Sequence, residues 1–160
     1  MKTKQQQAES MNIRIDDLHT IEPITDHQHQ AFNAWREGDH LALMGTAGTG
    51  KTFLAMYLAL EEVLDRSTPY DQLVIVRSVV PTRDVGYLPG SLEEKLDAFT
   101  GPYRAATAEM FEDNKAYEKL IHNDYLKFES TSYIRGVTFD HSIILVDECQ
   151  NLNFHELDSV

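Results

Sequence analysis

The chain has 160 residues, of which 42% are hydrophobic and 25% are charged, with a formal net charge of -12. This size and mix suit one globular domain with a real core. The longest apolar run, residues 53–60, is far shorter than the ~20 residues that span a bilayer, and residues 1–7 lack an apolar signal core. The single cysteine, Cys149, excludes an internal disulfide, and no Cys/His cluster has zinc-ligand spacing. A cytoplasmic protein with no membrane association is expected.

The excess of acidic over basic residues argues against some binding partners. Proteins that hold a nucleic acid backbone usually present a basic face, whereas this chain has 26 acidic and 14 basic residues. Local arginines such as Arg77 and Arg135 could still form a groove, although most exposed arginines are simply solvated. The chain as a whole therefore does not look like a basic nucleic-acid binder.

The N-terminal residues differ in character from the rest of the chain. Residues 1–20 are polar and Gln-rich and are expected to form a flexible tail, although Met11, Ile13 and Ile15 alternate as in a short strand. Residues 21–160 are expected to form the single folded domain.

Within that domain, alternating helix and strand signals predict an α/β protein. A helix is predicted from Asp26 to about Gly38, followed by a buried strand over residues 41–44 and a largely covered helix over residues 51–64. The continuous apolar run at residues 73–76 is typical of a parallel strand buried on both faces. Residues 81–90 are rich in turn residues and predict a loop.

The second half of the domain repeats the pattern. A capping box over residues 91–94 opens a helix, and the apolar spacing over residues 103–111 indicates another. A short strand is predicted over residues 126–129 and a buried strand over residues 143–146. Strands separated by helices imply a mainly parallel sheet.

A glycine-rich motif stands between the first predicted strand and the helix that follows. Residues 45–52 fit Gly-x-x-x-x-Gly-Lys-Ser/Thr at every fixed position, a match expected by chance in roughly one chain of this length in 200. In such a loop, backbone N–H groups and a helix N-terminus surround phosphate oxygens, which a merely structural Gly-rich turn would not do. Lys51 should reach the β and γ phosphates of ATP, and the Thr52 hydroxyl should ligate Mg²⁺. The predicted nucleotide-binding residues of this loop are Gly45, Thr46, Ala47, Gly48, Thr49, Gly50, Lys51 and Thr52.

Two acidic residues end the last predicted strand, where open α/β sheets bind ligands. Asp147 is predicted to hold Mg²⁺ through its water shell, and Glu148 to polarise the water that attacks the γ phosphate. Alone, such a pair is often a plain surface turn, but together with the glycine-rich loop it predicts an ATPase site. Small-molecule kinases generally lack the second acid, so hydrolysis is favoured over phosphate transfer to a metabolite.

Two glutamines stand at positions that resemble motifs of helicases. Gln150 completes Asp-Glu-x-Gln, which resembles motif II of superfamily 1 helicases and implies γ-phosphate sensing. Gln28 lies where those helicases place a glutamine that hydrogen-bonds adenine, with Gln30 as the second choice. The alternative for Gln150 is an ordinary polar loop residue, and the alternative for Gln28 is a solvated residue at a helix start.

Further motifs resemble the PhoH-like ATPase family over about residues 25–151. They are Val76-Arg77-Ser78-Val79-Val80, residues 85–95 with Gly-Tyr-Leu-Pro-Gly, Tyr133-Ile134-Arg135-Gly136, and Asp147-Glu148-Cys149-Gln150-Asn151. The resemblance implies a cytoplasmic ATP-binding protein with a helicase-like RecA core, often induced by phosphate starvation. By the same analogy Arg77 and Arg135 contact nucleic acid, or a phosphate across a subunit boundary, unless each only fixes a loop by a salt bridge.

RecA-like sheets of this type insert a further strand between the phosphate-loop strand and the aspartate strand, and that strand follows motif II in sequence. Only residues 152–160 follow here, where a helix at residues 153–160 would barely begin. The expected fold class is therefore an α/β P-loop NTPase with a RecA-like, mainly parallel sheet that is incomplete at the C-terminus.

These patterns predict a Mg²⁺-dependent ATPase whose hydrolysis is coupled to single-stranded RNA or DNA, within a homo-oligomer that supplies an arginine in trans. The alternative is a nucleotide-dependent binding or regulatory module with negligible turnover, which truncation and acidity both favour. A metabolite kinase is a third possibility, but nothing in the sequence builds an acceptor pocket.

Overall fold

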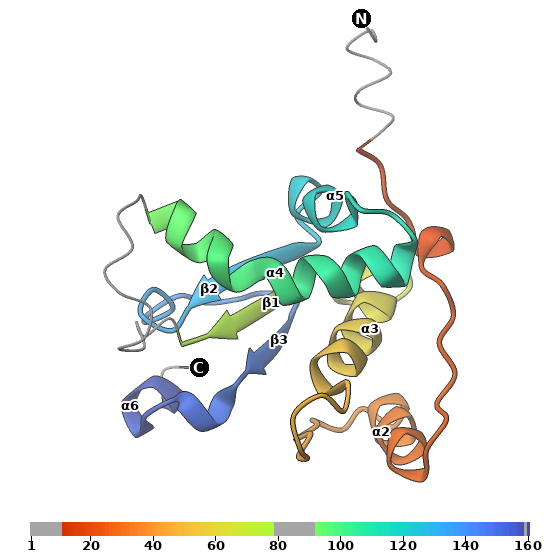
Figure 1. Ribbon diagram of the computed structural model, residues 1–160, viewed down its shortest axis with the longest axis horizontal. Helices are drawn as coiled ribbons and strands as arrows, with labels where there is room; N and C mark the ends of the chain where they lie inside the picture. The colour runs from red at the N-terminus through yellow and green to blue at the C-terminus, as the bar shows by residue number, and fades with distance from the viewer. Residues whose placement is uncertain (1–10, 79–91, 159) are drawn as a thin grey trace, which may run out of the picture.

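The computed structural model describes residues 11–78, 92–158 and 160, with the backbone alone for residues 92–98 (Figure 1). The predicted loop 81–90 lies outside these residues. The elements in chain order are a 3-10 helix η1 (Ile15–Asp17), helices α2 (Asp26–Arg36) and α3 (Lys51–Leu64), strand β1 (Gln72–Arg77), helices α4 (Leu92–Phe111) and α5 (Ala116–His122), strands β2 (Leu126–Ser130) and β3 (Ser142–Asp147), a 3-10 helix η2 (Cys149–Asn151) and helix α6 (Phe154–Leu157).

The three strands form one parallel sheet in the order β2-β1-β3, which confirms the predicted α/β class. In this register Leu73 lies opposite Leu126 and Ile143, and Arg77 lies opposite Ser130 and Asp147. Because all strands run the same way, their C-terminal ends meet at one edge of the sheet. The residues predicted for chemistry in β1 and β3 are therefore neighbours.

Strand β1 is the centre of the core. Successive side chains of a strand point to opposite faces, so Leu73 and Ile75 face the main core while Val74 and Val76 face a smaller cluster that includes Ile134. Helices α3 and α4 cover the main-core face, with α5 beside α4 (Figure 1). The continuous apolar run of β1 is thus explained by burial on both sides, as predicted.

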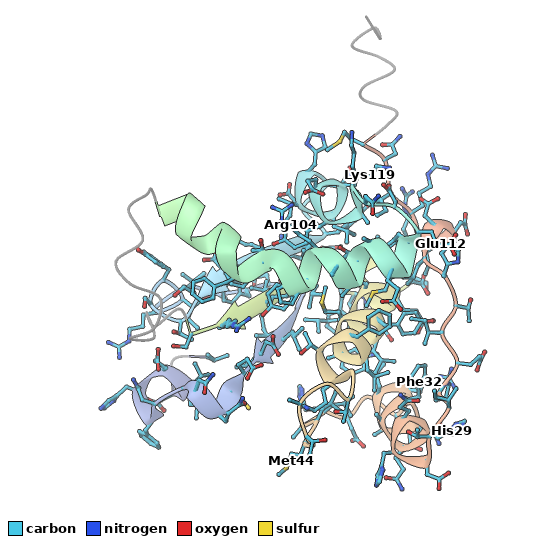
Figure 2. The ribbon with its side chains drawn as sticks, in the orientation of Figure 1. His29, Phe32, Met44, Arg104, Glu112 and Lys119 are labelled. Carbon is cyan, nitrogen blue, oxygen red and sulfur yellow. The ribbon has the colours of Figure 1, made fainter. Side chains whose placement is uncertain are left out.

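Two of the predicted buried strands differ from the prediction. Residues 41–44 are not a strand, and Met44 is 92% exposed and projects from the molecule (Figure 2). A strand needs a neighbour for its backbone hydrogen bonds, and no described segment pairs with these residues. Strand β3 forms as predicted but is only half-buried, because among the described strands it has one neighbour, β1.

Helices α2 and α3 match their predicted extents. Thr25 caps α2, accepting a hydrogen bond from the Gln28 N–H at 3.2 Å, and Gly38 follows the helix with φ +87°. Helix α3 runs from Lys51 to Leu64 and is buried along residues 56–60, as its lack of a polar face predicts.

Helix α4 is one continuous helix where two were predicted, and it contains Pro102. A proline inside a helix costs about 3 kcal/mol, because it removes an N–H donor and crowds the preceding turn. Burying a large apolar side chain contributes about 1.5–3 kcal/mol, and Tyr103 and Met110 are both fully buried. Tertiary packing therefore offsets the local cost of Pro102.

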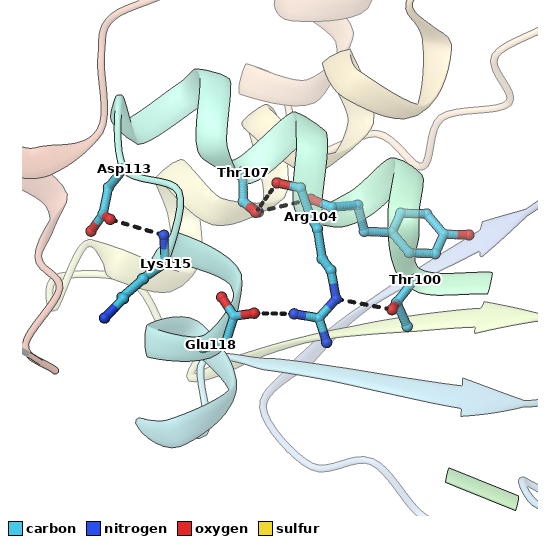
Figure 3. Close-up of polar contacts among 7 residues, drawn as sticks. Thr100, Arg104, Thr107, Asp113, Lys115 and Glu118 are labelled. Atoms are coloured by element: carbon cyan, nitrogen blue, oxygen red, sulfur yellow. Dashed lines mark hydrogen bonds and ion pairs between the residues drawn. The ribbon is translucent and has the colours of Figure 1, made fainter. Parts of the chain in front are cut away.

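Helix α5, which was not predicted, is tied to α4 by side chains from both helices (Figures 2 and 3). Arg104 pairs with Glu118, donates to Thr100 at 3.2 Å, and lies 4.6 Å from the centre of the Tyr117 ring. The Asp113 carboxylate accepts hydrogen bonds from the Lys115 N–H at 2.9 Å and from the Lys119 ammonium at 2.6 Å. These contacts join α4 to α5, and burial of Ala116, Tyr117 and Leu120 in the main core holds α5 in place.

The pair of Asp113 and Lys119 should make stability depend on pH. The hydrogen bond from Lys119 and that from the Lys115 N–H lower the pKa of Asp113 below its usual value. A depressed carboxyl pKa adds stability above the unfolded-state pKa of about 4, and this stability is lost as pH falls through the folded-state pKa. The free energy of unfolding of the wild type, measured in urea at neutral pH, should therefore exceed that of Asp113→Asn by about 0.2–1 kcal/mol. The difference should disappear in acid; a difference independent of pH would contradict the assignment.

The segment 11–20, predicted within the flexible tail, lies against the core. Ile13 is 5% exposed, and the Asn123 side-chain amide donates to the Met11 carbonyl at 2.8 Å. The His19 N–H donates to the Met110 carbonyl at 2.9 Å. The suggested strand at residues 11–15 is not formed, and η1 follows instead. Across the parts of the chain that the structure describes, no helix has the length and apolarity to cross a membrane.

Candidate functional site

The glycine-rich loop leads directly into the N-terminus of α3. Gly48 and Gly50 both have φ +76°, a conformation that side chains other than glycine rarely adopt, and Gly50 is the residue before the helix. The loop is exposed throughout residues 45–50. An exposed loop of this shape at the start of a 14-residue helix presents backbone N–H groups and a partial positive charge to an anion.

Lys51 is held by the same loop. Its ammonium donates to the carbonyl oxygens of Gly45 at 3.0 Å and Thr46 at 2.7 Å, and to the Thr49 hydroxyl at 3.3 Å. The positive charge thus lies at the loop rather than extending into solvent. This arrangement suits an ammonium that contacts phosphate oxygens bound by the loop.

Thr52 and Asp147 meet although 95 residues separate them in sequence. The Thr52 hydroxyl donates to one carboxylate oxygen of Asp147, Oδ1, at 2.9 Å. The hydroxyl of Tyr103 donates to the other oxygen, Oδ2, at 2.7 Å. The start of α3 and the end of β3 therefore share one polar cluster. The sequence pattern predicted that these two segments bind the same nucleotide.

Tyr103 is the one member of this cluster that sequence analysis missed. It was assigned only to the apolar face of a helix, and its place at 0% exposure in the core bears that out. Nothing in the local pattern distinguishes a core tyrosine from one whose hydroxyl reaches a functional carboxylate. Burial and the hydrogen bond to Asp147 raise the pKa of Tyr103 well above its usual value, so the hydroxyl keeps its proton and acts as a donor.

Glu148 directly follows the cluster and has an unusual backbone conformation. Its φ of +54° and ψ of +39° lie in the left-handed region, which costs a residue other than glycine or asparagine about 1–3 kcal/mol. Its side chain is exposed and accepts a hydrogen bond from the Gln150 amide. Glu112, Asp124 and His141 also have positive φ, so backbone strain alone does not mark a site. At Glu148 it coincides with the end of β3, beside Asp147.

An apolar pocket of about 140 Å³ lies beside the loop. Its lining includes Ile21, Pro23, Gln28, Phe32, Gly50 and Phe53. The side-chain oxygen of Gln28 accepts hydrogen bonds from the N–H groups of Ile24 at 2.8 Å and Thr25 at 3.2 Å. Gln28 therefore lines this pocket, whereas Gln30 does not, and contact of Gln28 with adenine stays a prediction.

The two candidate arginines lie in different surroundings. Arg77 ends β1 opposite Asp147, with its guanidinium 5.7 Å from the centre of the Phe99 ring. Arg135 is exposed in the loop after β2, next to the buried Ile134. The structure therefore places Arg77 beside Asp147 in the sheet. Contact of either arginine with nucleic acid stays a prediction.

The donor set of the cluster fits magnesium. Among the described residues no group of three His, Cys, Asp or Glu side chains could hold a metal by itself. Mg²⁺ at nucleotide sites typically takes one or two protein oxygens and fills its other positions with phosphate oxygens and water. The hydroxyl of Thr52 and the carboxylate of Asp147, 2.9 Å apart, are hard oxygen donors of this kind.

Comparison with known proteins agrees with the geometry. The family model described as PhoH-like protein matches residues 20–160. A PhoH-like protein of Synechocystis sp. is 34% identical over 137 residues, covering 85% of this chain and 41% of the relative. Protein PhoH2 of Bacillus subtilis is 37% identical over 124 residues, covering 75% of this chain and 28% of the relative.

A PhoH-like protein of Mycobacterium leprae is 30% identical over 139 residues, covering 86% of this chain and 39% of the relative. The chain thus spans less than half the length of these three relatives. The family match extends over nearly all of the chain, including the loop, β1 and the end of β3. The chain therefore belongs to the PhoH-like protein family, whose members are P-loop NTPases.

Proposed function

We propose that this protein binds ATP with Mg²⁺ and hydrolyses it, and that single-stranded RNA or DNA is coupled to hydrolysis in the whole protein. The observation that carries the proposal is the hydrogen bond between Thr52 and Asp147, at 2.9 Å. It joins the phosphate-binding loop to the acidic strand end. Two motifs with separate expected roles thus share one site.

Each residue has a defined task in this proposal. The loop N–H groups and Lys51 bind the phosphates, while Thr52 and Asp147 hold the magnesium ion. When bound, the metal neutralises charge that develops on the phosphate oxygens. Glu148 accepts a proton from the attacking water, and Gln150, which donates to Glu148, orients its carboxylate. Gln28 donates its amide N–H to the base in the adjacent apolar pocket.

Arg77 connects a nucleic acid to the site in this proposal. It lies at the carboxyl end of β1 beside the proposed metal site, where a bound strand and the nucleotide would influence the same residues. A second copy of the chain supplies an arginine in trans, and the protein acts in the cytoplasm. The family resemblance supports these features.

A binding or regulatory module with negligible turnover is the second candidate. The net charge of -12 favours it, because a strongly acidic chain repels a nucleic acid backbone. Phosphate release from ATP, measured with and without single-stranded RNA and single-stranded DNA, separates the two. Stimulated release supports the coupled ATPase, whereas ATP binding without release supports the module.

Replacing Lys51 with alanine tests nucleotide binding itself. The substitution removes a charge-assisted hydrogen bond worth about 1.5–3 kcal/mol, so ATP affinity should fall by about 10- to 100-fold in calorimetric titration. Lys115→Ala is a matched control, since Lys115 precedes α5 and does not contact the loop. Equal ATP affinity in wild type and Lys51→Ala would remove Lys51 from its assigned role.

A further inference from the structure

We propose that Tyr103 is a positioning residue of the magnesium site, whose hydroxyl holds the Asp147 carboxylate in the orientation that faces Thr52. This inference rests on the proposed nucleotide function and assigns a role within it to a helix that no nucleotide motif includes. Tyr103 lies on α4, whereas the predicted magnesium ligands come from the start of α3 and the end of β3.

The hydrogen bonds on Asp147 divide between its two oxygens. Tyr103 donates to Oδ2 at 2.7 Å and Thr52 donates to Oδ1 at 2.9 Å. A carboxylate that accepts a hydrogen bond at each oxygen cannot rotate without breaking one of the bonds. Thr52 is itself a proposed metal ligand, so Tyr103 is the partner that orients Asp147 without belonging to the metal's own coordination.

Tyr103 is itself fixed by its surroundings. Its side chain is fully buried, and its ring lies 5.7 Å from that of Phe128 on β2, centre to centre. Its carbonyl accepts a hydrogen bond from the Thr107 hydroxyl at 2.9 Å, within the same helix (Figure 3). The hydroxyl is therefore aimed by a packed ring and a rigid helix, rather than by a mobile surface chain.

The same helix also contacts the strand beside Asp147. Arg77 is the ladder neighbour of Asp147, and Phe99 of α4 lies beside its guanidinium. The hydrogen bonds of the cluster run from Tyr103 to Asp147 and from Thr52 to Asp147. The position of α4 therefore reaches the proposed metal-binding carboxylate through one hydroxyl.

A role for Tyr103 in core packing alone would predict a different effect of substitution. If the ring only fills the core, phenylalanine should replace it with no consequence for metal binding. If the hydroxyl orients Asp147, the same substitution should weaken metal binding while the fold and the metal-free phosphate contacts remain. Loss of such an orienting partner typically costs about 10–100-fold in metal affinity.

The test uses Tyr103→Phe in the 160-residue chain, with Mn²⁺ as the metal probe and a non-hydrolysable ATP analogue at saturation. Free Mn²⁺ is measured by electron paramagnetic resonance. We expect the Mn²⁺ dissociation constant to rise by about tenfold or more, with unchanged affinity for the analogue in chelator. Tyr117→Phe, the same chemical change on α5, should leave both values at the wild-type level.

Two further variants keep the result decisive. Phe128→Leu removes the ring that packs against Tyr103, so it should raise the Mn²⁺ dissociation constant in the same direction but less, and it tests the role even if Tyr103→Phe impairs folding. In an Asp147→Asn background, Tyr103→Phe should cause no additional loss, because the hydroxyl then has no carboxylate to orient.

The outcomes separate the inference from the proposed function. Unchanged Mn²⁺ affinity in folded Tyr103→Phe, or in Phe128→Leu where that variant is the one that folds, overturns the positioning role. Wild-type chain that binds no Mn²⁺ together with the analogue instead overturns the proposed magnesium-nucleotide site, and the positioning role with it.

Discussion

Glu148→Gln should lower phosphate release from ATP by about 10²- to 10⁴-fold, the contribution of a positioned general base, while ATP affinity stays at the wild-type level. The amide keeps the size of the side chain but cannot accept the proton of the attacking water. Single-turnover release of labelled phosphate, measured at saturating ATP, isolates the chemical step from binding.

Glu112→Gln is a matched control for this experiment. Glu112 is also an exposed glutamate with positive φ, 48° against 54° for Glu148, but it follows α4 and pairs with His19. Its substitution should leave release unchanged. Equal rates in wild type and Glu148→Gln would show that another group accepts the proton, and an equal loss in Glu112→Gln would indicate a structural cause.

Ile75→Ala should lower the free energy of unfolding by about 2–5 kcal/mol in urea titration followed by circular dichroism. Ile75 is fully buried at the centre of β1 and packs in the main core, so truncation removes apolar contacts and leaves a cavity. Ile121→Ala is the control, because Ile121 is 38% exposed on α5 and should lose far less. A loss below about 0.5 kcal/mol for Ile75→Ala would mean that β1 is not the centre of the core.

The placement of β1 also explains why a core substitution is expected to affect the site. Arg77, at the end of the same strand, lies opposite Asp147. The polar cluster is built on the C-terminal ends of two paired strands. Destabilising β1 should therefore weaken nucleotide binding in proportion to the unfolded fraction, a loss that added ATP partly reverses.

Local patterns predicted several elements correctly because their signals do not depend on distant residues. Helix α3 begins at Lys51 and ends at Leu64 as predicted, and β1 includes the apolar run 73–76. The left-handed conformations of Gly48 and Gly50 follow from glycine's lack of a Cβ. The assigned roles of the loop residues and of Glu148 stay predictions, which the experiments above address.

Predictions that depended on a partner elsewhere in the chain were less successful. Residues 41–44 have the apolar run of a strand, but in the described chain no neighbouring strand bonds to them. Helix α4 continues through Pro102 because burial of Tyr103 and Met110 outweighs a local penalty. Helix α5 has only seven residues, so its apolar positions Ala116, Tyr117 and Leu120 give a short periodic signal although all three are buried in the core.

The amino-acid sequence by itself determined the chemical inventory of this protein: the glycine-rich loop with Lys51 and Thr52, the adjacent acids Asp147 and Glu148, and the α/β order of elements. Only the tertiary structure decided that a buried tyrosine hydroxyl on α4 completes the hydrogen bonding of Asp147. The physical reason is that a motif records spacing along the chain. A hydrogen bond between residues 44 positions apart depends on how helix and sheet pack in space.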